Sequence, residues 1–365
     1  PWPLSETSVL VTRQVEPGKP RTGIFLVDTF GNELLLHAGR RGSYDPMPLA
    51  PRAIPPVIPV ARGYDRQPGT FYVQDAGIGT HMEGVEPGEI RHLRVIESPP
   101  KLGWTKSAWG GQGQQAPGMN WHNFENKRIL GTVPVEQDGS AYFECPPDRF
   151  VFFQQLDPDG TILHSKRSGT LIQPGERQGC SGCHESRVEG AAPPAAMAAA
   201  LRRPPSKLTG WHGPPRLFSY QREIQPIFDR HCVSCHDFGE PAGEKLILAG
   251  DRTLVFNASY TDLWSLGYLS CIGGGPAEIQ PAKSWGARHS RLVKVLREGH
   301  PDHREVELSA AELQRIITWV DLNAPYYPRF ESAYPEGLAG RSPLADGELA
   351  ELVRLTGGRP VKGHG

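Results

Sequence analysis

Two short cysteine motifs constrain the fold of this chain more than any other feature. They read Cys180-Ser181-Gly182-Cys183-His184 and Cys232-Val233-Ser234-Cys235-His236. Two thiols three residues apart on a helical turn point the same way, toward the two vinyl groups of one porphyrin, and the next histidine is placed under the iron. The pattern predicts two covalently bound c-type haems. We expect thioether bonds and proximal iron ligation from these residues: Cys180, Cys183, His184, Cys232, Cys235 and His236.

Two other chemistries use paired cysteines, a Cys₄ zinc site and a redox disulfide. The two pairs are 48 residues apart, longer than the usual zinc-ribbon spacing, and neither chemistry needs a histidine after each pair. Haem is therefore favoured. The remaining thiols, Cys145 and Cys271, could form a disulfide or be separate buried thiols.

Covalent haem attachment takes place on the exported side of the bacterial membrane, so the motifs predict a periplasmic or extracellular protein. No apolar run approaches the roughly 20 residues needed to span a bilayer, so we expect no transmembrane segment. The chain begins at Pro1 rather than Met, as a processed or truncated product would, so the lack of a signal peptide carries no information. The net charge of −1 gives no electrostatic case for nucleic acid.

The second axial ligand of each iron determines whether it only passes electrons or also binds a small molecule. For the second haem we expect His300, which follows a short apolar segment, with His289 and His303 as alternatives. For the first haem, the ligand stays open, and one alternative is no protein ligand at all. The candidates are His122, His81, His92, His164, His212, Met82, Met119 and Met197.

The first half of the chain has the pattern of β-structure. Hairpins are predicted for 24–28 with 33–37, for 132–136 with 141–144, and for 150–154 with 161–164, each across a turn sequence. Residues 48–59 are too rich in proline for a helix or a central strand, so we expect an extended connector.

The second half has helical patterns. Residues 220–231 carry apolar side chains on one face, and Ser309 to Glu312 form a capping box before an apolar stripe that ends near Asn323. A last helix is expected from Ser342 to before Gly357. The expected fold is α+β and multidomain: a β-rich N-terminal half, then a mainly helical cytochrome c-like domain. The expected parts are 1–60, 61–178 (β-sandwich-like), 179–216 (first haem segment), 217–335 (cytochrome c-like, second haem) and 336–365 (C-terminal helix and tail).

Several of these segments resemble proteins related to the hydrazine synthase alpha subunit. The resemblance rests on 131–143, on Pro174-Gly175-Glu176 before the first motif, on Ile224-Gln225-Pro226-Ile227 before the second, and on 317–327. It covers roughly residues 1–335, and it implies that the N-terminal hairpin is the last blade of a β-propeller whose other blades are absent from this chain.

The resemblance implies a bis-histidine second haem, with His236 proximal and a histidine of the C-terminal domain opposite. At the first haem of hydrazine synthase, a tyrosine four residues after the motif histidine binds the iron, and the motif histidine turns to a zinc. This chain has Val188 at that position. His184 is then expected to bind iron in the ordinary way, and hydrazine synthesis is not expected.

Together these features predict a dihaem c-type cytochrome that transfers electrons to a redox partner protein. The alternatives are an enzyme that converts a small nitrogen compound or peroxide at an open first haem, and a structural subunit of a multihaem redox complex or filament. A homo-oligomer or a larger complex fits any of the three, and whether the chain is an enzyme stays open.

Overall fold

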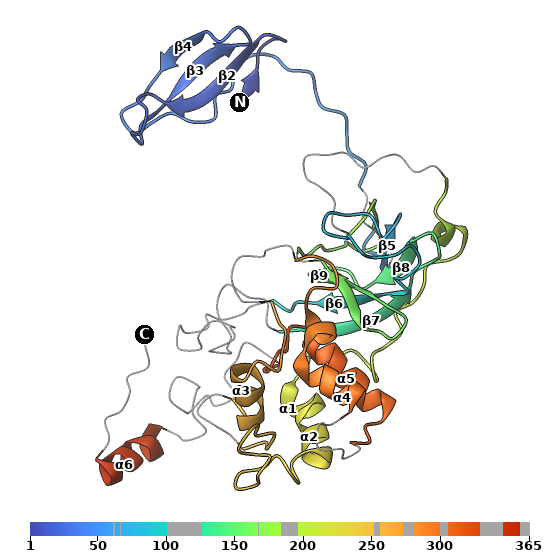
Figure 1. Ribbon diagram of the computed structural model, residues 1–365. Coiled ribbons are helices and arrows are strands. Elements are labelled where there is room, and N and C mark those ends of the chain that lie inside the picture. The colour runs from blue at the N-terminus through green and yellow to red at the C-terminus, as the bar shows by residue number, and fades with distance from the viewer. Residues whose placement is uncertain are drawn as a thin grey trace. The chain divides into compact units, whose positions relative to one another are not determined.

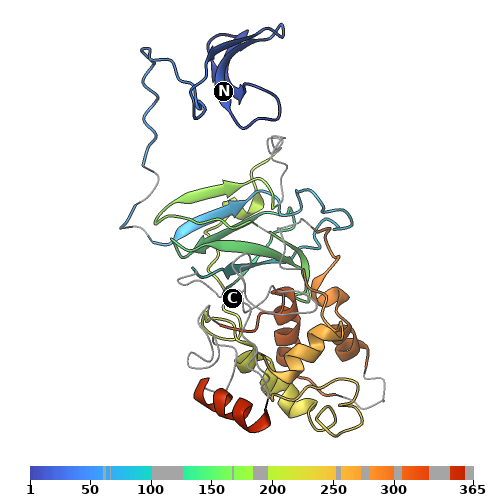
Figure 2. The same cartoon turned by 90° about the vertical axis from the view of Figure 1, so that its left-hand side faces the viewer.

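The computed structural model describes residues 1–60, 63–65, 67–100, 126–166, 168–183, 196–251, 256–272, 280–299, 306–328 and 346–357. The chain divides into two compact units, Pro1–Pro59 and Val60–Gly365. Figures 1 and 2 show the first unit as a small sheet and the second as sheets beside short helices. None of the described helices is long and apolar enough to cross a membrane.

The N-terminal unit is one antiparallel sheet in the order β1-β2-β3-β4, formed by Trp2–Pro3, Ser8–Gln14, Thr22–Asp28 and Glu33–His37. The predicted hairpin is confirmed, with Val27 opposite Glu33. The Asp28 carboxylate closes its turn by accepting hydrogen bonds from the backbone N–H of Phe30 at 3.0 Å and of Asn32 at 2.9 Å. The predicted connector, 48–59, contains no helix or strand.

The second unit begins with seven strands. They are β5 (Gly69–Val73), β6 (His92–Glu97), β7 (Arg128–Pro134), β8 (Ala141–Cys145), β9 (Val151–Leu156), β10 (Ile162–Ser165) and β11 (Arg177–Cys180). One sheet has the order β10-β9-β6-β7 and the other the order β11-β5-β8. The rings of Phe71, Phe143 and Phe153 meet with centroids 5.4 to 5.8 Å apart, so the two sheets share a core.

One of the two hairpins predicted here is confirmed and the other is wrong. β9 and β10 pair across their turn. Between β7 and β8 the turn does form, since Glu136 N–H donates to the Ser140 carbonyl oxygen at 2.8 Å. The two strands then enter different sheets, because β7 pairs with β6 and β8 pairs with β5. Turn residues reverse the chain, but the partner of each strand is chosen by distant apolar neighbours.

The helices of the second half are α1 (Tyr220–Glu223), α2 (Gln225–His231), α3 (Ala258–Ser265), α4 (Arg291–Glu298), α5 (Ala310–Asp321) and α6 (Asp346–Thr356). The expected helix 220–231 is broken at Ile224, since Pro226 lacks an N–H and starts a new helix. The capping box of Ser309 and Glu312 is confirmed. Ser342, the expected start of the last helix, lies outside the described residues. The described helices are short and joined by loops, so this half has a few helices and is not mainly helical.

The sheet β10-β9-β6-β7 separates two apolar cores. Alternate residues of a strand point to opposite faces. Ile96, Ile129 and Phe152 face a core shared with α1, α2, α4 and α5. Leu93, Val95 and Phe153 face the core shared with β5 and β8. We call these the helix-side core and the sandwich core.

A buried polar network fixes α5 on this sheet. The Arg94 guanidinium, from β6, donates to Gln154 Oε1 at 3.0 Å and to Thr318 Oγ1 of α5 at 3.2 Å. Gln154 Nε2 donates to the Asp321 carbonyl oxygen at 2.6 Å, and the Asp321 carboxylate accepts from Ile162 N–H at 2.9 Å. The Arg94 and Asp321 side chains are both buried, and removing a partner from a buried hydrogen-bonded group is costly. The network therefore joins the sheet to α5.

Candidate haem attachment sites

The second cysteine motif forms a helical turn directly after α2. Cys232 N–H donates to the Phe228 carbonyl oxygen at 2.8 Å, and His236 N–H donates to the Cys232 carbonyl oxygen at 2.9 Å. Phe228 anchors this turn because its ring is buried in the helix-side core, and Cys232 packs against the same core. Burial raises the pKa of the Cys232 thiol to about 12, and Cys235 adds to the shift. The turn matches the backbone expected for haem attachment.

His236 is held in one tautomer by a backbone carbonyl. Its Nδ1 lies 2.9 Å from the carbonyl oxygen of Leu246. A carbonyl oxygen only accepts, so Nδ1 must carry the proton and the lone pair is on Nε2. Metal-binding histidines are commonly oriented in this way through their other ring nitrogen. The loop is closed by Leu248 N–H, which donates to the His236 carbonyl oxygen at 2.9 Å. The donor set therefore fits a c-type haem with His236 as an axial ligand.

The expected opposite ligand, His300, lies outside the described residues, as does the alternative His303. The structure does describe the preceding helix, α4, whose Leu292 and Val293 are buried in the helix-side core. His289, the other alternative, is exposed, and its Nε2 lies 2.5 Å from the Lys283 carbonyl oxygen. His300 therefore remains a prediction, and it follows a helix that packs on the core holding Cys232.

The first motif has a different backbone from the helical turn that was expected. Cys180 is the last residue of β11, which pairs in parallel with β5. The next residues bend along 74–78: Asp75 N–H donates to the Ser181 carbonyl oxygen at 3.1 Å, and Cys183 N–H donates to that of Ile78 at 3.1 Å. A Cβ at Gly182 would overlap the Ile78 carbonyl oxygen, so this approach requires glycine. His184, the expected proximal ligand, lies outside the described residues.

Cys183 faces the sandwich core. Both Cys180 and Cys183 pack against that core, and burial raises the pKa of the Cys183 thiol to about 12. The Gln155 side chain lies beside this thiol and acts to lower its pKa, against the larger effect of burial. Its Nε2 donates to the Ala76 carbonyl oxygen. The sequence motifs gave no sign of Gln155. Its role follows from the register of β9, which turns residue 155 toward the first motif while residue 154 faces α5.

Among the candidate distal ligands for the first haem, His164 is the one that pairs with a residue beside the first motif. It lies directly opposite Gln155 in the β9–β10 pair, and opposite residues share a face of the sheet. The side chain is 2% exposed. Burial lowers its pKa, with a further contribution from His81, so the imidazole is neutral at pH 7. Met82 is buried in the same sandwich core, whereas His81 is exposed.

The other candidates are elsewhere. His92 precedes Leu93 on β6, and since Leu93 is opposite Gln155, His92 points to the other face. His212 lies against the Trp211 ring, which packs on the helix-side core. Met197 is exposed, and His122 and Met119 lie outside the described residues.

The cysteine pairs are held apart, one against each core. This placement does not fit a shared Cys₄ zinc site, and nowhere in the described ranges do three His, Cys, Asp or Glu side chains gather to hold a metal ion. Cys145 and Cys271 form no disulfide: one is buried in the sandwich core and the other packs on the helix-side core. Of the two interpretations left open for them, separate thiols is the one observed.

Comparison with known proteins relates this chain to the hydrazine synthase alpha subunit. Residues 88–185 match the model of the hydrazine synthase alpha subunit middle domain. Hydrazine synthase subunit alpha of Kuenenia stuttgartiensis is 22% identical over 350 residues, covering 72% of this chain and 43% of that protein. A solved structure, Kuenenia stuttgartiensis hydrazine synthase, superposes with a TM-score of 0.58 at 18% identity, covering 84% of this chain and 54% of the other. The chain thus spans less than half of the length of the curated relative it matches.

Proposed function

Because this chain is related to the hydrazine synthase alpha subunit, we propose that it is a haem protein of that kind: a dihaem c-type cytochrome that transfers electrons on the exported side of a membrane. The observation that carries this proposal is the second motif. There a helical turn presents two thiols, and the Leu246 carbonyl oxygen holds His236 with its lone pair on Nε2. When bound, the two haems supply the redox chemistry.

The chain's own residues would hold each haem through two thiols and a histidine. Cys232, Cys235 and His236 would hold one on the helix-side core, and Cys180, Cys183 and His184 the other on the sandwich core. An apolar surround of this kind excludes water, and the axial ligands set the potential. We further propose His164 as the second protein ligand at the first haem, because it shares the face of the sheet from which Gln155 reaches Cys183.

The placement of the two motifs supports electron transfer. The first motif packs against the sandwich core and the second against the helix-side core, and these cores lie on opposite faces of the sheet β10-β9-β6-β7. Both motifs belong to one compact unit, Val60–Gly365, so two haems bound there would be carried by one folded body. A redox partner protein would then take electrons from one of the two.

Hydrazine synthesis is not proposed. Val188 stands where the resemblance implies an iron-binding tyrosine. The second candidate is an enzyme acting on a small nitrogen compound or peroxide at an open first haem, and it requires that His164 leave that iron unligated. Ligation therefore decides between the two functions.

The test is an EPR spectrum of the ferric protein, with the haem content quantified beside it. We expect two haems per chain and two low-spin signals. Cys180→Ala with Cys183→Ala should remove one haem and its signal, and Cys232→Ala with Cys235→Ala should remove the other. A high-spin signal that disappears in the first double variant would support the enzyme in place of electron transfer. Absence of covalent haem from the wild-type protein would overturn the proposal.

A further inference from the structure

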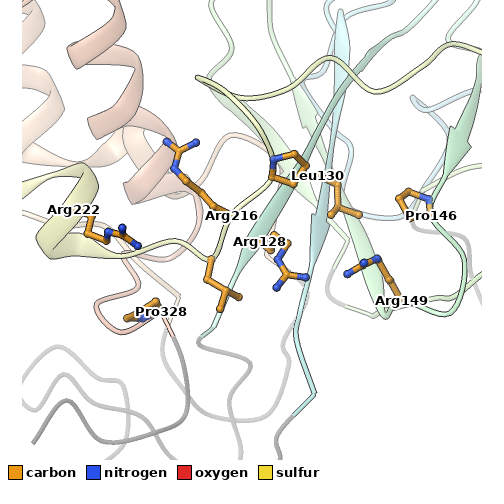
Figure 3. Close-up of a pocket in the computed structure, with 9 residues that line it drawn as sticks. Arg128, Leu130, Pro146, Arg149, Arg216, Arg222 and Pro328 are labelled. Carbon is orange, nitrogen blue, oxygen red and sulfur yellow. The ribbon is translucent and has the colours of Figure 1, made fainter.

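A pocket of about 570 Å³ lies where the sandwich meets the helical part of the second unit. Figure 3 shows its lining side chains. Arg128 and Leu130 come from β7, Pro146 and Arg149 from the loop between β8 and β9, and the opposite wall comes from 215–217, Arg222 of α1 and Pro328. Four of the nine lining residues are arginines, and none of the nine is acidic.

The nearby carboxylates do not balance these arginines. Glu97, 6% exposed at its side chain, receives Arg128 Nη1 at 2.9 Å and Arg149 Nη1 at 2.9 Å. Glu223, equally buried, receives Arg216 and also Arg315, which is outside the pocket lining. Among the described residues, five guanidinium groups, Arg315 included, face two carboxylates, so the excess at the pocket is at least two positive charges.

The four lining arginines differ in how many of their N–H donors already make hydrogen bonds. All three nitrogens of the Arg216 guanidinium already donate to protein atoms. Nε and Nη2 donate to the Glu223 carboxylate, and Nη1 donates to three carbonyl oxygens, including that of Trp211. Arg128 and Arg149 each give only Nη1 to Glu97, so their Nε and Nη2 donors make no hydrogen bond within the described residues. The exposed Arg222 side chain likewise makes no hydrogen bond or ion pair within that part of the chain.

We propose that this pocket binds an oxyanion that carries two negative charges. Guanidinium groups present paired donors that match carboxylate and phosphate oxygens, and such charge-assisted hydrogen bonds are the strong ones. The excess of at least two positive charges selects a dianion over chloride. The volume is in the range of small-molecule sites, so the anion can be part of a larger organic molecule. A phosphate ester and a dicarboxylate share this chemistry, and the proposal does not depend on the haems.

The test is isothermal titration calorimetry of the full chain with its haems, at fixed ionic strength. The probes are inorganic phosphate, pyrophosphate and malonate, with chloride as the monovalent reference. We expect saturable binding of one dianion per chain, tighter than any binding of chloride. Pyrophosphate above malonate would assign a phosphate ester, and the reverse order a dicarboxylate.

Arg222→Gln and Arg149→Gln should each weaken that binding about tenfold or more, since a charge-assisted hydrogen bond is lost. Arg222→Gln breaks no contact within the described residues, so folding should be unchanged, which the haem absorption spectrum checks. The matched control is Arg91→Gln, an exposed arginine at the opposite end of the β6–β7 pair, which should bind as the wild type does. No saturable binding of any probe, or equal losses in all three variants, would overturn the proposal.

Discussion

A single hydrogen bond, from His236 Nδ1 to the Leu246 carbonyl oxygen, sets which ring nitrogen can bind a metal. Near the first motif, Gln155 of β9 donates to the Ala76 carbonyl oxygen and lies beside the Cys183 thiol. The first of these contacts spans ten residues, whereas the second joins distant parts of the chain. The motif residues could be predicted from sequence because haem attachment needs them to be neighbours. Gln155 could not, since its role depends on which face of a sheet it occupies.

His164→Ala should change the spin state of the first haem. If His164 binds this iron as proposed, the substitution would remove a strong-field ligand, so one low-spin EPR signal should become high-spin while the covalent haem content stays that of the wild-type protein. His92→Ala, on the opposite face of the same sheet, is the control and should leave both signals low-spin. If His164→Ala also leaves both signals unchanged, His164 is not a ligand, and the thioether of Met82 becomes the next candidate.

Among the elements, α5 is joined by hydrogen bonds to the sheet that separates the two cores. Its start was predictable because the capping box is a local pattern, and Ser309 does accept a hydrogen bond from Glu312 N–H at 3.3 Å. Its burial partners were not predictable, since Thr318 and Asp321 meet Arg94 and Gln154 from strands far earlier in the chain. The same limit explains the wrong β7–β8 pairing: local turn chemistry was right, and the choice of sheet was made by long-range packing.

Ser309→Ala should lower the free energy of unfolding by about 1 kcal/mol, the usual cost of losing an N-cap side chain. Chemical denaturation of the protein as purified measures this. Ser265→Ala is the control, because Ser265 is an exposed serine at the last position of α3. An equal effect in the two variants would mean that the cap of α5 contributes nothing specific.

The pH dependence of the free energy of unfolding should show the raised pKa of Asp321. Burial raises its pKa from 3.8 to about 6, against the opposing effect of Arg94. Because the folded state holds this proton more tightly than the unfolded state does, the stabilising contribution is present below pH 4 and is lost as the pH rises to 6. Compared with Asp321→Asn, the wild-type free energy of unfolding should fall by about 3 kcal/mol across that interval.

The comparison with Asp321→Asn separates Asp321 from other carboxyl groups, such as Glu312, which titrate in the opposite direction at lower pH. Hydrogen bonds from Ser309 lower the Glu312 pKa to about 2, so its contribution is lost as the pH falls. Denaturation curves of both proteins between pH 4 and pH 7 give the difference. A difference that stays constant, or that grows in favour of the wild type as the pH rises, would contradict the raised pKa of Asp321.

For the molecule as a whole, the N-terminal unit carries a run of exposed apolar side chains on one strand. All five residues of β4 are exposed, among them Leu34, Leu35 and Leu36 at 58%, 44% and 50%. β4 is also an edge strand, and an exposed apolar edge is a place where another chain can add. The proline-rich stretch could be predicted from composition, whereas this exposure depends on which strands surround β4.

Self-association through β4 would cover its exposed leucines. We therefore expect the molecular mass measured by light scattering to rise with protein concentration. Replacing Leu34 and Leu36 with serine should reduce that rise. Leu355→Ser, which changes an exposed leucine on α6, is the matched control and should leave it unchanged. A mass that is independent of concentration in the wild-type protein would argue against self-association through this strand.

The different backbones of the two haem motifs have a consequence for timing. The turn from Cys232 to His236 is made by contacts within a few residues, so it can form as soon as that stretch emerges. Cys180, by contrast, ends a strand that pairs in parallel with β5, a late event because its partner is far away in the chain. Once that pairing closes, Cys183 packs against the sandwich core. If haem attaches at both motifs as proposed, attachment at the first motif must come before this pairing, so a delay in haem supply should produce chains that carry only the second haem.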